Sequence, residues 1–230
     1  FVANRAHHAD IGCARPGSMP WSRTLADEGL VIAPTRLVER GRDNDALLAR
    51  LRAGLRNPQS TLADFTAQRS ANLRGLERLA HLAGSLREDS LDAMFARLNT
   101  YAETMARRAL ARLRPGRYVA RDVMDGDARA PGPIPVVATI DIGTDAVVVD
   151  FAGTSPQVAS NINCPLSVTA AAVYYVFYCL MPSGTPACAG SLRPVTLRAP
   201  AGCLVNAQPP AAVAAGNIET SQRLVDVLLM

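Results

Sequence analysis

The spacing of hydrophobic residues divides the chain into a loop-rich start, a helical middle and a β-rich remainder. Residues 1–33 are punctuated by Gly and Pro and show no regular period. From 34 to 114, leucines recur every three or four positions, as in amphipathic helices. From 115 to 230, short β-branched runs replace that period. This order predicts an α+β fold, in which the helical segment packs on a mixed, mainly antiparallel β-meander with additional helices.

Three helices are expected in the middle segment. The first follows a capping sequence at 43–45 and ends at Asn57, because the residue before a proline disfavours helical geometry. The second runs from about 60 to 83. The third runs from about 86 to 113, where Arg114-Pro115-Gly116 stops it, and its apolar residues predict one continuous buried stripe.

The remaining segment alternates short apolar runs with turn residues. Its longest apolar run, Val168 to Met181, is shorter than the roughly 18 residues that cross a membrane, so we expect a buried helix over 164–181 and no membrane partner. A last helix starts near Thr220. We expect strands at residues 118–120, 136–140, 147–151, 194–197 and 203–205.

Composition removes several classes of function. All 24 basic residues are Arg, they are spread along the chain, and aromatic residues make up only 5%, so a nucleic-acid partner is not expected. Lys is absent, which excludes an ATP site of the P-loop type on this chain.

The cysteines and the two ends suggest where the protein works. Five cysteines without CxxC spacing predict reduced thiols and a cytoplasmic location. The chain starts without Met or a signal peptide, and it stops within an apolar helical pattern. We therefore expect a piece of a longer polypeptide, with 1–230 forming part of one catalytic domain.

The most distinctive chemistry lies in the first loop. His7 and His8 are adjacent, and Asp10 follows at the mouth of a Gly/Pro loop. Imidazole and carboxylate ligands suit Zn²⁺, Mn²⁺ or Fe²⁺. In an extended chain His7 and His8 point to opposite faces, so other ligands must complete a metal site. The alternative is a pair of histidines hydrogen-bonded in a turn.

Three further segments carry candidate binding residues. Asp64, Gln68 and Asn72 share one face of the second expected helix and line either a polar pocket or a solvated surface. The loop after 147–151 and the run that opens the last helix are either substrate-binding walls or ordinary turns and caps, with a local Glu219–Arg223 ion pair in the second case. The candidate substrate-binding residues are Asp64, Gln68, Thr154, Ser155, Gln157, Asn217, Glu219, Thr220 and Ser221.

Taken in order, these stretches resemble the hydantoinase B/5-oxoprolinase B-type family. The matching stretches are Asn4 to Gly12, Pro16 to Pro20, Glu28 to Leu30, Asn57-Pro58, Asp64 to Gln68, Asp150 to Gln157, Arg193-Pro194 and Gly216 to Arg223. The resemblance spans nearly the whole chain.

The resemblance implies an ATP-linked, metal-dependent hydrolase of cyclic amides such as hydantoins or 5-oxoproline. An A-type subunit or domain would bind ATP and phosphorylate the carbonyl, and the B-type part would open the ring with a metal-activated water. The family's metal ligands would map onto His7 and Asp10, with His8 beside them and further ligands upstream.

Two other functions are compatible with this resemblance. Related large subunits occur in acetone- and acetophenone-type carboxylases, so the parent protein is alternatively a ketone carboxylase. Cys13 and Ala63 stand where the family usually has Gly. A truncated, non-catalytic scaffold that binds the A-type partner is the third possibility.

Overall fold

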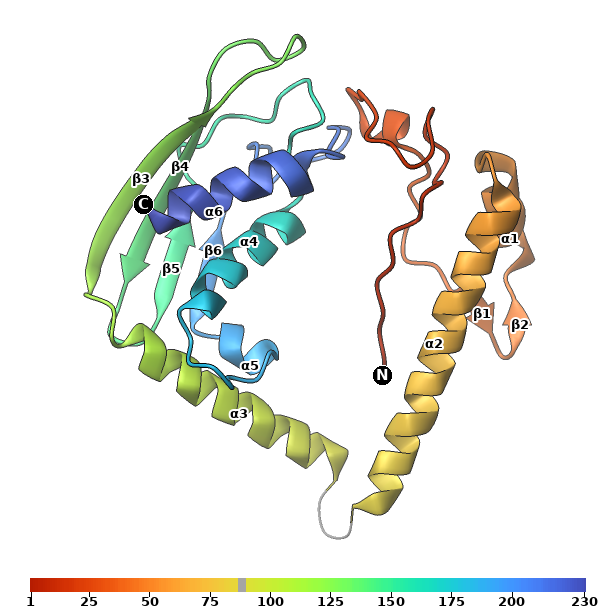
Figure 1. Ribbon diagram of the computed structural model, residues 1–230, viewed down its shortest axis with the longest axis horizontal. Helices are drawn as coiled ribbons and strands as arrows, with labels where there is room; N and C mark the ends of the chain where they lie inside the picture. Colours follow the sequence, from red (N-terminus) through yellow and green to blue (C-terminus); the bar gives the residue numbers. More distant parts are fainter. Residues whose placement is uncertain (87–89) are drawn as a thin grey trace.

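The computed structural model describes residues 1–86 and 90–230, and its architecture is α+β, as predicted. Residues 87–89, inside the expected third helix, lie outside the described part. Within the described ranges, no helix combines the length and apolar character needed to cross a membrane. Figure 1 shows two arms that meet at the lower ends of α2 and α3, with the N-terminal segment running between them.

The first arm contains the start of the chain and two helices. A short 3₁₀ helix, η1 (Leu25–Glu28), precedes a two-stranded hairpin of β1 (Val38–Glu39) and β2 (Arg42–Asp43), which the hydrophobic pattern did not predict. Helix α1 (Asp45–Gly54) is capped by Asn44, whose side chain accepts from the Leu47 amide. Helix α2 (Pro58–Ser85) is capped by Asn57 and starts two residues earlier than expected.

The second arm is built on a four-stranded sheet in the order β3-β4-β5-β6. Strands β3 to β5 are antiparallel, and β6 runs parallel to β5. The strands are β3 (Gly116–Met124), β4 (Ile134–Ile142), β5 (Val147–Asp150) and β6 (Val195–Arg198). The helices are α3 (Leu91–Leu110), α4 (Leu166–Cys179), α5 (Ala189–Leu192) and α6 (Ser221–Leu229), the last preceded by a π-helical turn, η2 (Gly216–Thr220).

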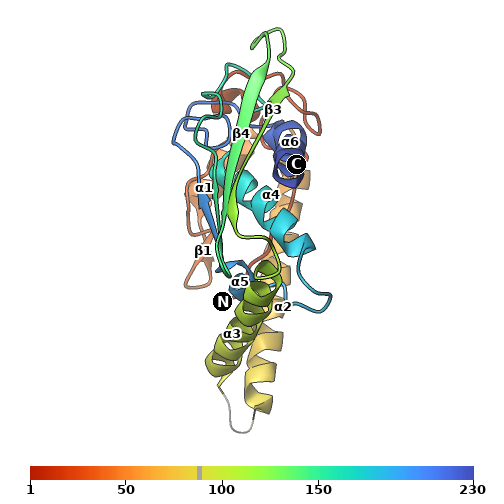
Figure 2. The ribbon, with the colours of Figure 1, turned by 90° about the vertical axis from the view of Figure 1, so that its left-hand side faces the viewer.

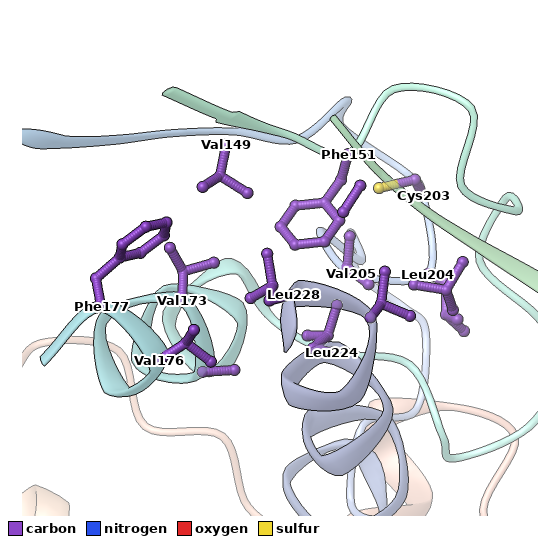
Figure 3. Close-up of a cluster of buried hydrophobic side chains, with 14 of the residues drawn as sticks. Val149, Phe151, Val173, Val176, Phe177, Cys203, Leu204, Val205, Leu224 and Leu228 are labelled. Atoms are coloured by element: carbon purple, nitrogen blue, oxygen red, sulfur yellow. The ribbon is translucent and has the colours of Figure 1, made fainter. Parts of the chain in front are cut away.

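The main core lies between the sheet and the helices α4 and α6, which cover one of its faces (Figures 1 and 2). Figure 3 shows Phe151 and Val149 facing Leu224 and Leu228 of α6, with Val173 on α4 beside them. Four of these five side chains are completely removed from solvent, and Leu228 is 8% exposed. Burial of one such side chain contributes about 1.5–3 kcal/mol, so this contact fixes α4 and α6 on the sheet.

Two expectations about local structure are wrong. Residues 203–205 form no strand but a buried turn, in which Cys203 makes one isolated bridge to Pro156. Three consecutive apolar residues report burial, and burial alone does not distinguish a turn from a strand. The buried stripe of α3 is also incomplete, since Ala102 and Ala109 are buried whereas Phe95 is 45% and Leu98 is 43% exposed.

Candidate functional site

The N-terminal segment lies along the polar face of α2. The side-chain amide of Asn4 donates to the carbonyl oxygen of Gln68 at 2.8 Å and to Oδ1 of Asn72 at 2.9 Å. The imidazole of His8 stacks on Phe65, with ring centroids 4.6 Å apart, and its Nε2 lies 3.0 Å from Oε1 of Gln68. The face that carries Gln68 and Asn72 is therefore a contact surface for the first loop, and not simply a solvated face.

These hydrogen bonds determine which nitrogen of His8 carries the proton. The backbone carbonyl of Gln68 can only accept, so the Asn4 amide nitrogen faces it and Oδ1 of Asn4 accepts from Nε2 of Gln68 at 2.9 Å. Oε1 of Gln68 is then left for His8, whose Nε2 must donate. In the neutral ring, a lone pair remains on Nδ1 of His8.

That nitrogen is buried and has no hydrogen-bond partner within the described residues. The nearest carboxylate oxygen, Oδ2 of Asp64, lies 3.9 Å away, and the Asp64 side chain is 56% exposed. An orphaned buried nitrogen of this kind is uncommon in folded proteins and is a candidate for a ligand contact. Of the two predicted neighbours in this region, Gln68 hydrogen-bonds to Nε2 and so orients the ring, and Asp64 is the carboxylate nearest to Nδ1.

Asp10 is buried and anchors the loop to the junction of α1 and α2. Its Oδ1 accepts from the Gly12 amide at 3.0 Å, and its Oδ2 accepts from the Asn57 amide at 2.6 Å. The Asn57 hydrogen bond is the main reason that the pKa of the Asp10 carboxyl lies below its ordinary value, against the opposing effect of burial. Gly12 has φ of +92°, and a Cβ there would lie 2.6 Å from the Gly54 carbonyl oxygen.

The loop offers some donors of a metal site and lacks others. The His7 side chain is exposed and has no hydrogen bond in the described part of the chain. Within that part, no three His, Cys, Asp or Glu side chains are grouped so as to hold a metal ion. The free His7 ring and the orphaned Nδ1 of His8 fit the nitrogen donors of such a site, but a four-coordinate metal needs ligands beyond these.

The predicted residues of the loop after β5 are engaged with backbone groups. Oγ1 of Thr154 exchanges two hydrogen bonds of 3.0 Å with the backbone of Val137. The Ser155 hydroxyl donates to a neighbouring carbonyl, and the Gln157 side chain pairs with the backbone of Gln208 at 2.8 and 3.3 Å. This geometry matches the ordinary-turn alternative and does not bring the three side chains together around a vacancy.

The predicted residues before α6 are distributed over different surroundings. Thr220 is buried and donates to the Ile162 carbonyl, so it holds the π-helical turn in place. Glu219 and Arg223 do not form the local ion pair, because Arg223 pairs with Asp122 on β3 and lies 3.7 Å from Asp226. Glu219 instead borders a separate cavity of about 370 Å³.

Asn217 and Ser221 line a different cavity, of about 650 Å³, between the N-terminal segment, α4 and the start of α6. Arg5 from the N-terminal segment and Ser167 from α4 complete its polar lining. Sequence reasoning did not single out Arg5, although Asn4 to Gly12 was recognised as a motif. The feature that could have indicated Arg5 is the alternation of side chains along an extended segment, because every second side chain then points away from α2.

Glu28 is the other residue whose contacts the sequence did not reveal, although it begins the matching stretch Glu28 to Leu30. Its buried carboxylate accepts from the Ser22 hydroxyl at 2.6 Å and from the Val213 and Ala214 amides, each at 2.8 Å. Asn161 adds a hydrogen bond of 2.6 Å to the Pro20 carbonyl. These contacts fix the first loop to the second arm.

Comparison with known proteins identifies the fold and the family. Among solved structures, the ATP-dependent caprolactamase of Pseudomonas jessenii has a TM-score of 0.85 at 24% identity, covering 95% of this chain and 39% of that one. Nucleotide-free acetone carboxylase has a TM-score of 0.72 at 17% identity, covering 92% and 30%. Both likenesses concern the fold.

Similarity in sequence extends over the whole chain. It is 34% identical to 5-oxoprolinase 1 of Arabidopsis thaliana and 32% identical to the 5-oxoprolinases of Saccharomyces cerevisiae and Dictyostelium discoideum, in each case over 100% of this chain. The chain spans only 20%, 19% and 18% of the lengths of those three proteins. The sequence model of the Hydantoinase B/oxoprolinase family matches residues 1–230, so the chain belongs to that family.

Proposed function

We propose that the protein to which this chain belongs hydrolyses the C–N bond of a small cyclic amide in an ATP-dependent reaction, and that this chain is part of its B-type component. The family match over residues 1–230 and the relatives named 5-oxoprolinase support this reaction class. The structural observation that carries it is the orphaned, buried Nδ1 of His8, which follows the exposed His7 in the first loop.

The reaction divides between two components. The A-type partner binds ATP and transfers its γ-phosphoryl group to the amide oxygen, which makes that oxygen a leaving group. Water then adds to that carbon and the C–N bond breaks, the nitrogen taking up a proton, which leaves an acyl phosphate. A second water cleaves the acyl phosphate to the carboxylate and releases phosphate. In total, one ATP and two waters give ADP, phosphate and the ring-opened amino acid.

On this chain we assign His7, Asp10 and His8 to the metal centre, which would hold Zn, Mn or Fe with ligands from elsewhere in the protein. A bound divalent metal lowers the pKa of its water, so that hydroxide is available near neutral pH. Asp10 fixes the loop through the Gly12 and Asn57 amides. Gln68 holds the His8 ring through Nε2 and leaves Nδ1 without a partner among the described residues.

The remaining predicted residues belong to substrate binding in this proposal. Asn217 and Ser221 border the cavity of about 650 Å³, and Oδ2 of Asp64 lies 3.9 Å from Nδ1 of His8. Thr154, Ser155, Gln157 and Thr220 position their loops through hydrogen bonds to backbone groups, and Glu219 borders the separate cavity. The five cysteines are all unpaired, which supports the expected reducing, cytoplasmic location.

Purified full-length protein and its A-type partner provide the test. We expect ADP and a ring-opened acid from cyclic amides, and no product without ATP. ATP consumption that depends on a ketone and bicarbonate would instead identify a carboxylase, which the fold of acetone carboxylase keeps as the second candidate. Binding of the partner without turnover of either substrate would identify a scaffold.

The metal assignment has its own test with a matched control. Metal content per protein is measured by mass spectrometry for the wild type, for His7→Ala and for His81→Ala, a substitution of the third histidine, on α2. We expect metal to fall for His7→Ala and to stay unchanged for His81→Ala. Equal metal content in all three proteins would contradict the assignment of His7 as a ligand.

A further inference from the structure

The cavity of about 370 Å³ lies where the first loop of the chain meets the second arm. Its walls come from the first loop, the end of β3, the segment before α4 and the turn before α6. Figure 1 shows the first loop beside that turn, and the hydrogen bonds of Glu28 to the Val213 and Ala214 amides join the two. None of its described lining residues also lines the cavity of about 650 Å³, so the two are separate places in the fold.

Three carboxylates border this cavity, and none of its described lining residues is positively charged. The side chains of Asp125 and Glu219 are exposed and form no hydrogen bond or ion pair among the residues that the structure describes. Asp127 is held in place, since its Oδ1 accepts from two amides of its own loop at 2.7 and 2.9 Å and its Oδ2 accepts from the Ser160 hydroxyl. The lining therefore carries negative charge that no residue within it balances.

A buried asparagine adds an acceptor without a donor. Asn161 lines the cavity and is 7% exposed, and its side-chain nitrogen donates to the Pro20 carbonyl at 2.6 Å. No group in residues 1–86 and 90–230 donates to its Oδ1. Within that part of the chain, only Nδ1 of His8 is both unpaired and sealed from solvent, so Oδ1 of Asn161 remains accessible to a ligand. Since the side-chain acceptors of buried residues are usually paired, a donor from a ligand is the expected partner.

The remaining walls are apolar and include an aromatic ring. Met124 and Ile162 are buried, whereas Met19 is 41% and Trp21 is 73% exposed. The guanidinium carbon of Arg129 lies 4.9 Å from the centroid of the Trp21 ring, a cation–π contact that shows the affinity of this ring for a guanidinium. Arg129 is not among the lining residues, and its single charge balances only one of the three carboxylates.

These walls match an organic cation better than an anion or a metal ion. Apart from the indole N–H of Trp21, every free polar side-chain group of the lining is an acceptor, so the ligand must supply donors. Within the described residues, no three carboxylate, imidazole or thiol groups are grouped so as to hold a metal ion. A guanidinium provides five N–H donors in one plane and stacks on aromatic rings. A volume of about 370 Å³ lies near the lower limit of small-molecule sites, which leaves room for this group on a short alkyl chain.

We propose that this cavity binds a guanidinium group carried on a short alkyl chain. Asp125, Glu219 and Oδ1 of Asn161 accept hydrogen bonds from the guanidinium, and Trp21 covers the alkyl chain. The inference goes beyond the proposed reaction, because it assigns Glu219 to a second ligand that is distinct from the cyclic amide. A free small molecule and an arginine side chain of the A-type partner both carry this group, and the experiments below separate the two sources.

The first experiment compares two ligands of nearly the same shape that differ in charge. Saturation-transfer difference NMR on the full-length protein measures the Kd of N-propylguanidinium and of N-propylurea, in which a neutral carbonyl replaces one charged C–N group. Wild type is compared with Asp125→Asn, with Glu219→Gln and with the double variant. Glu77→Gln is the matched control, because Glu77 is an exposed carboxylate on α2, outside the cavity.

We expect wild type to bind propylguanidinium about 10-fold more tightly than propylurea, since two surface ion pairs and a cation–π contact each contribute a factor of about two to five. Each single substitution should weaken propylguanidinium binding by about 2- to 5-fold, and the double variant should lose most of the preference. Glu77→Gln should keep it, and all variants should keep the wild-type urea midpoint of unfolding. Equal binding of the two ligands by wild type, binding of neither, or an unchanged preference in the double variant would each overturn the inference. Displacement of propylguanidinium by an equal concentration of Mg²⁺ would also overturn it, because the carboxylates would then form a metal site.

The second experiment identifies the source of the guanidinium. The purified A-type partner is added to full-length protein that holds propylguanidinium, and release of the probe is followed by the same NMR signal. Release, together with weaker partner binding by the double variant than by Glu77→Gln, identifies an arginine of the partner as the occupant. Retention of the probe identifies a free alkylguanidinium compound instead. Both results support the cavity assignment, which does not depend on whether a cyclic amide is hydrolysed.

Discussion

The contact of Glu28 with the second arm makes a quantitative prediction about stability. In Glu28→Ala, the amides of Val213 and Ala214 and the hydroxyl of Ser22 all lose their acceptor. Ser22 is buried, and an unsatisfied buried donor costs about 1–3 kcal/mol, whereas each half-buried amide loses a hydrogen bond of about 1 kcal/mol, so the free energy of unfolding should fall by about 3 kcal/mol or more.

A second variant, Glu28→Gln, separates the contacts of the two carboxylate oxygens. Oε1 accepts from Ser22, Val213 and Ala214, whereas Oε2 accepts only from Val213, at 3.1 Å. A glutamine can keep its oxygen at the first position and lose only the second contact. We expect a loss of about 1 kcal/mol, the contribution of a single hydrogen bond.

Urea unfolding followed by circular dichroism measures these differences. Glu77→Ala serves as the control, because Glu77 is exposed and forms only a surface ion pair with Arg74, which contributes about 0–1 kcal/mol. If Glu28→Ala lies within about 1 kcal/mol of wild type, or if Glu28→Gln is as unstable as Glu28→Ala, the carboxylate does not hold the two arms as described.

Three shorter predictions concern the second arm. The hydrogen bond from the Ser160 hydroxyl, with smaller contributions from backbone amides, keeps the pKa of Asp127 below its ordinary value. The ionised Asp127 therefore stabilises the fold at neutral pH, and this stabilisation is lost as the pH falls below about 4. Urea unfolding at several pH values should show the stability difference between wild type and Asp127→Asn shrinking over that range. Gly190→Ala should lower the melting temperature by several degrees, because its Cβ would lie 2.0 Å from a backbone oxygen on α3. Burial raises the pKa of the Cys164 thiol to about 12, so this cysteine should not react with iodoacetamide, whereas the exposed Cys179 should. A mass-spectrometric time course of labelling at a pH of about 8 measures the difference.

Local signals in the sequence predicted the elements of the fold well. Asn44 and Asn57 cap α1 and α2 at the expected junctions, because an amide side chain that accepts from the first turn is a local interaction. The meander followed from β-branched runs separated by turns. The turn at Cys203–Val205 was not distinguished from a strand, because its hydrogen bonds, such as that from the Leu204 amide to the Ser155 carbonyl, join distant segments.

The same limit applies to the candidate site. The motif identified His7, His8 and Asp10 as chemically notable, and the helical period placed Gln68 on one face of α2. Neither pattern shows that these two groups meet, since His8 and Gln68 are sixty residues apart and touch only in the folded chain. Arg5 was overlooked for this reason: its significance lies in the cavity walls on α4 and α6, more than 160 residues away.

The three motif side chains have different tasks in the fold, and this affects how any metal experiment is read. Asp10 accepts two backbone amides and is 4% exposed, so its removal disturbs the junction of α1 and α2 as well as any ligand. His8 packs on Phe65 and hydrogen-bonds to Gln68. Only His7 is exposed and without such contacts among the described residues. Loss of metal in His7→Ala with unchanged stability would therefore report ligation, whereas the same loss in Asp10→Ala would also follow from displacement of the loop.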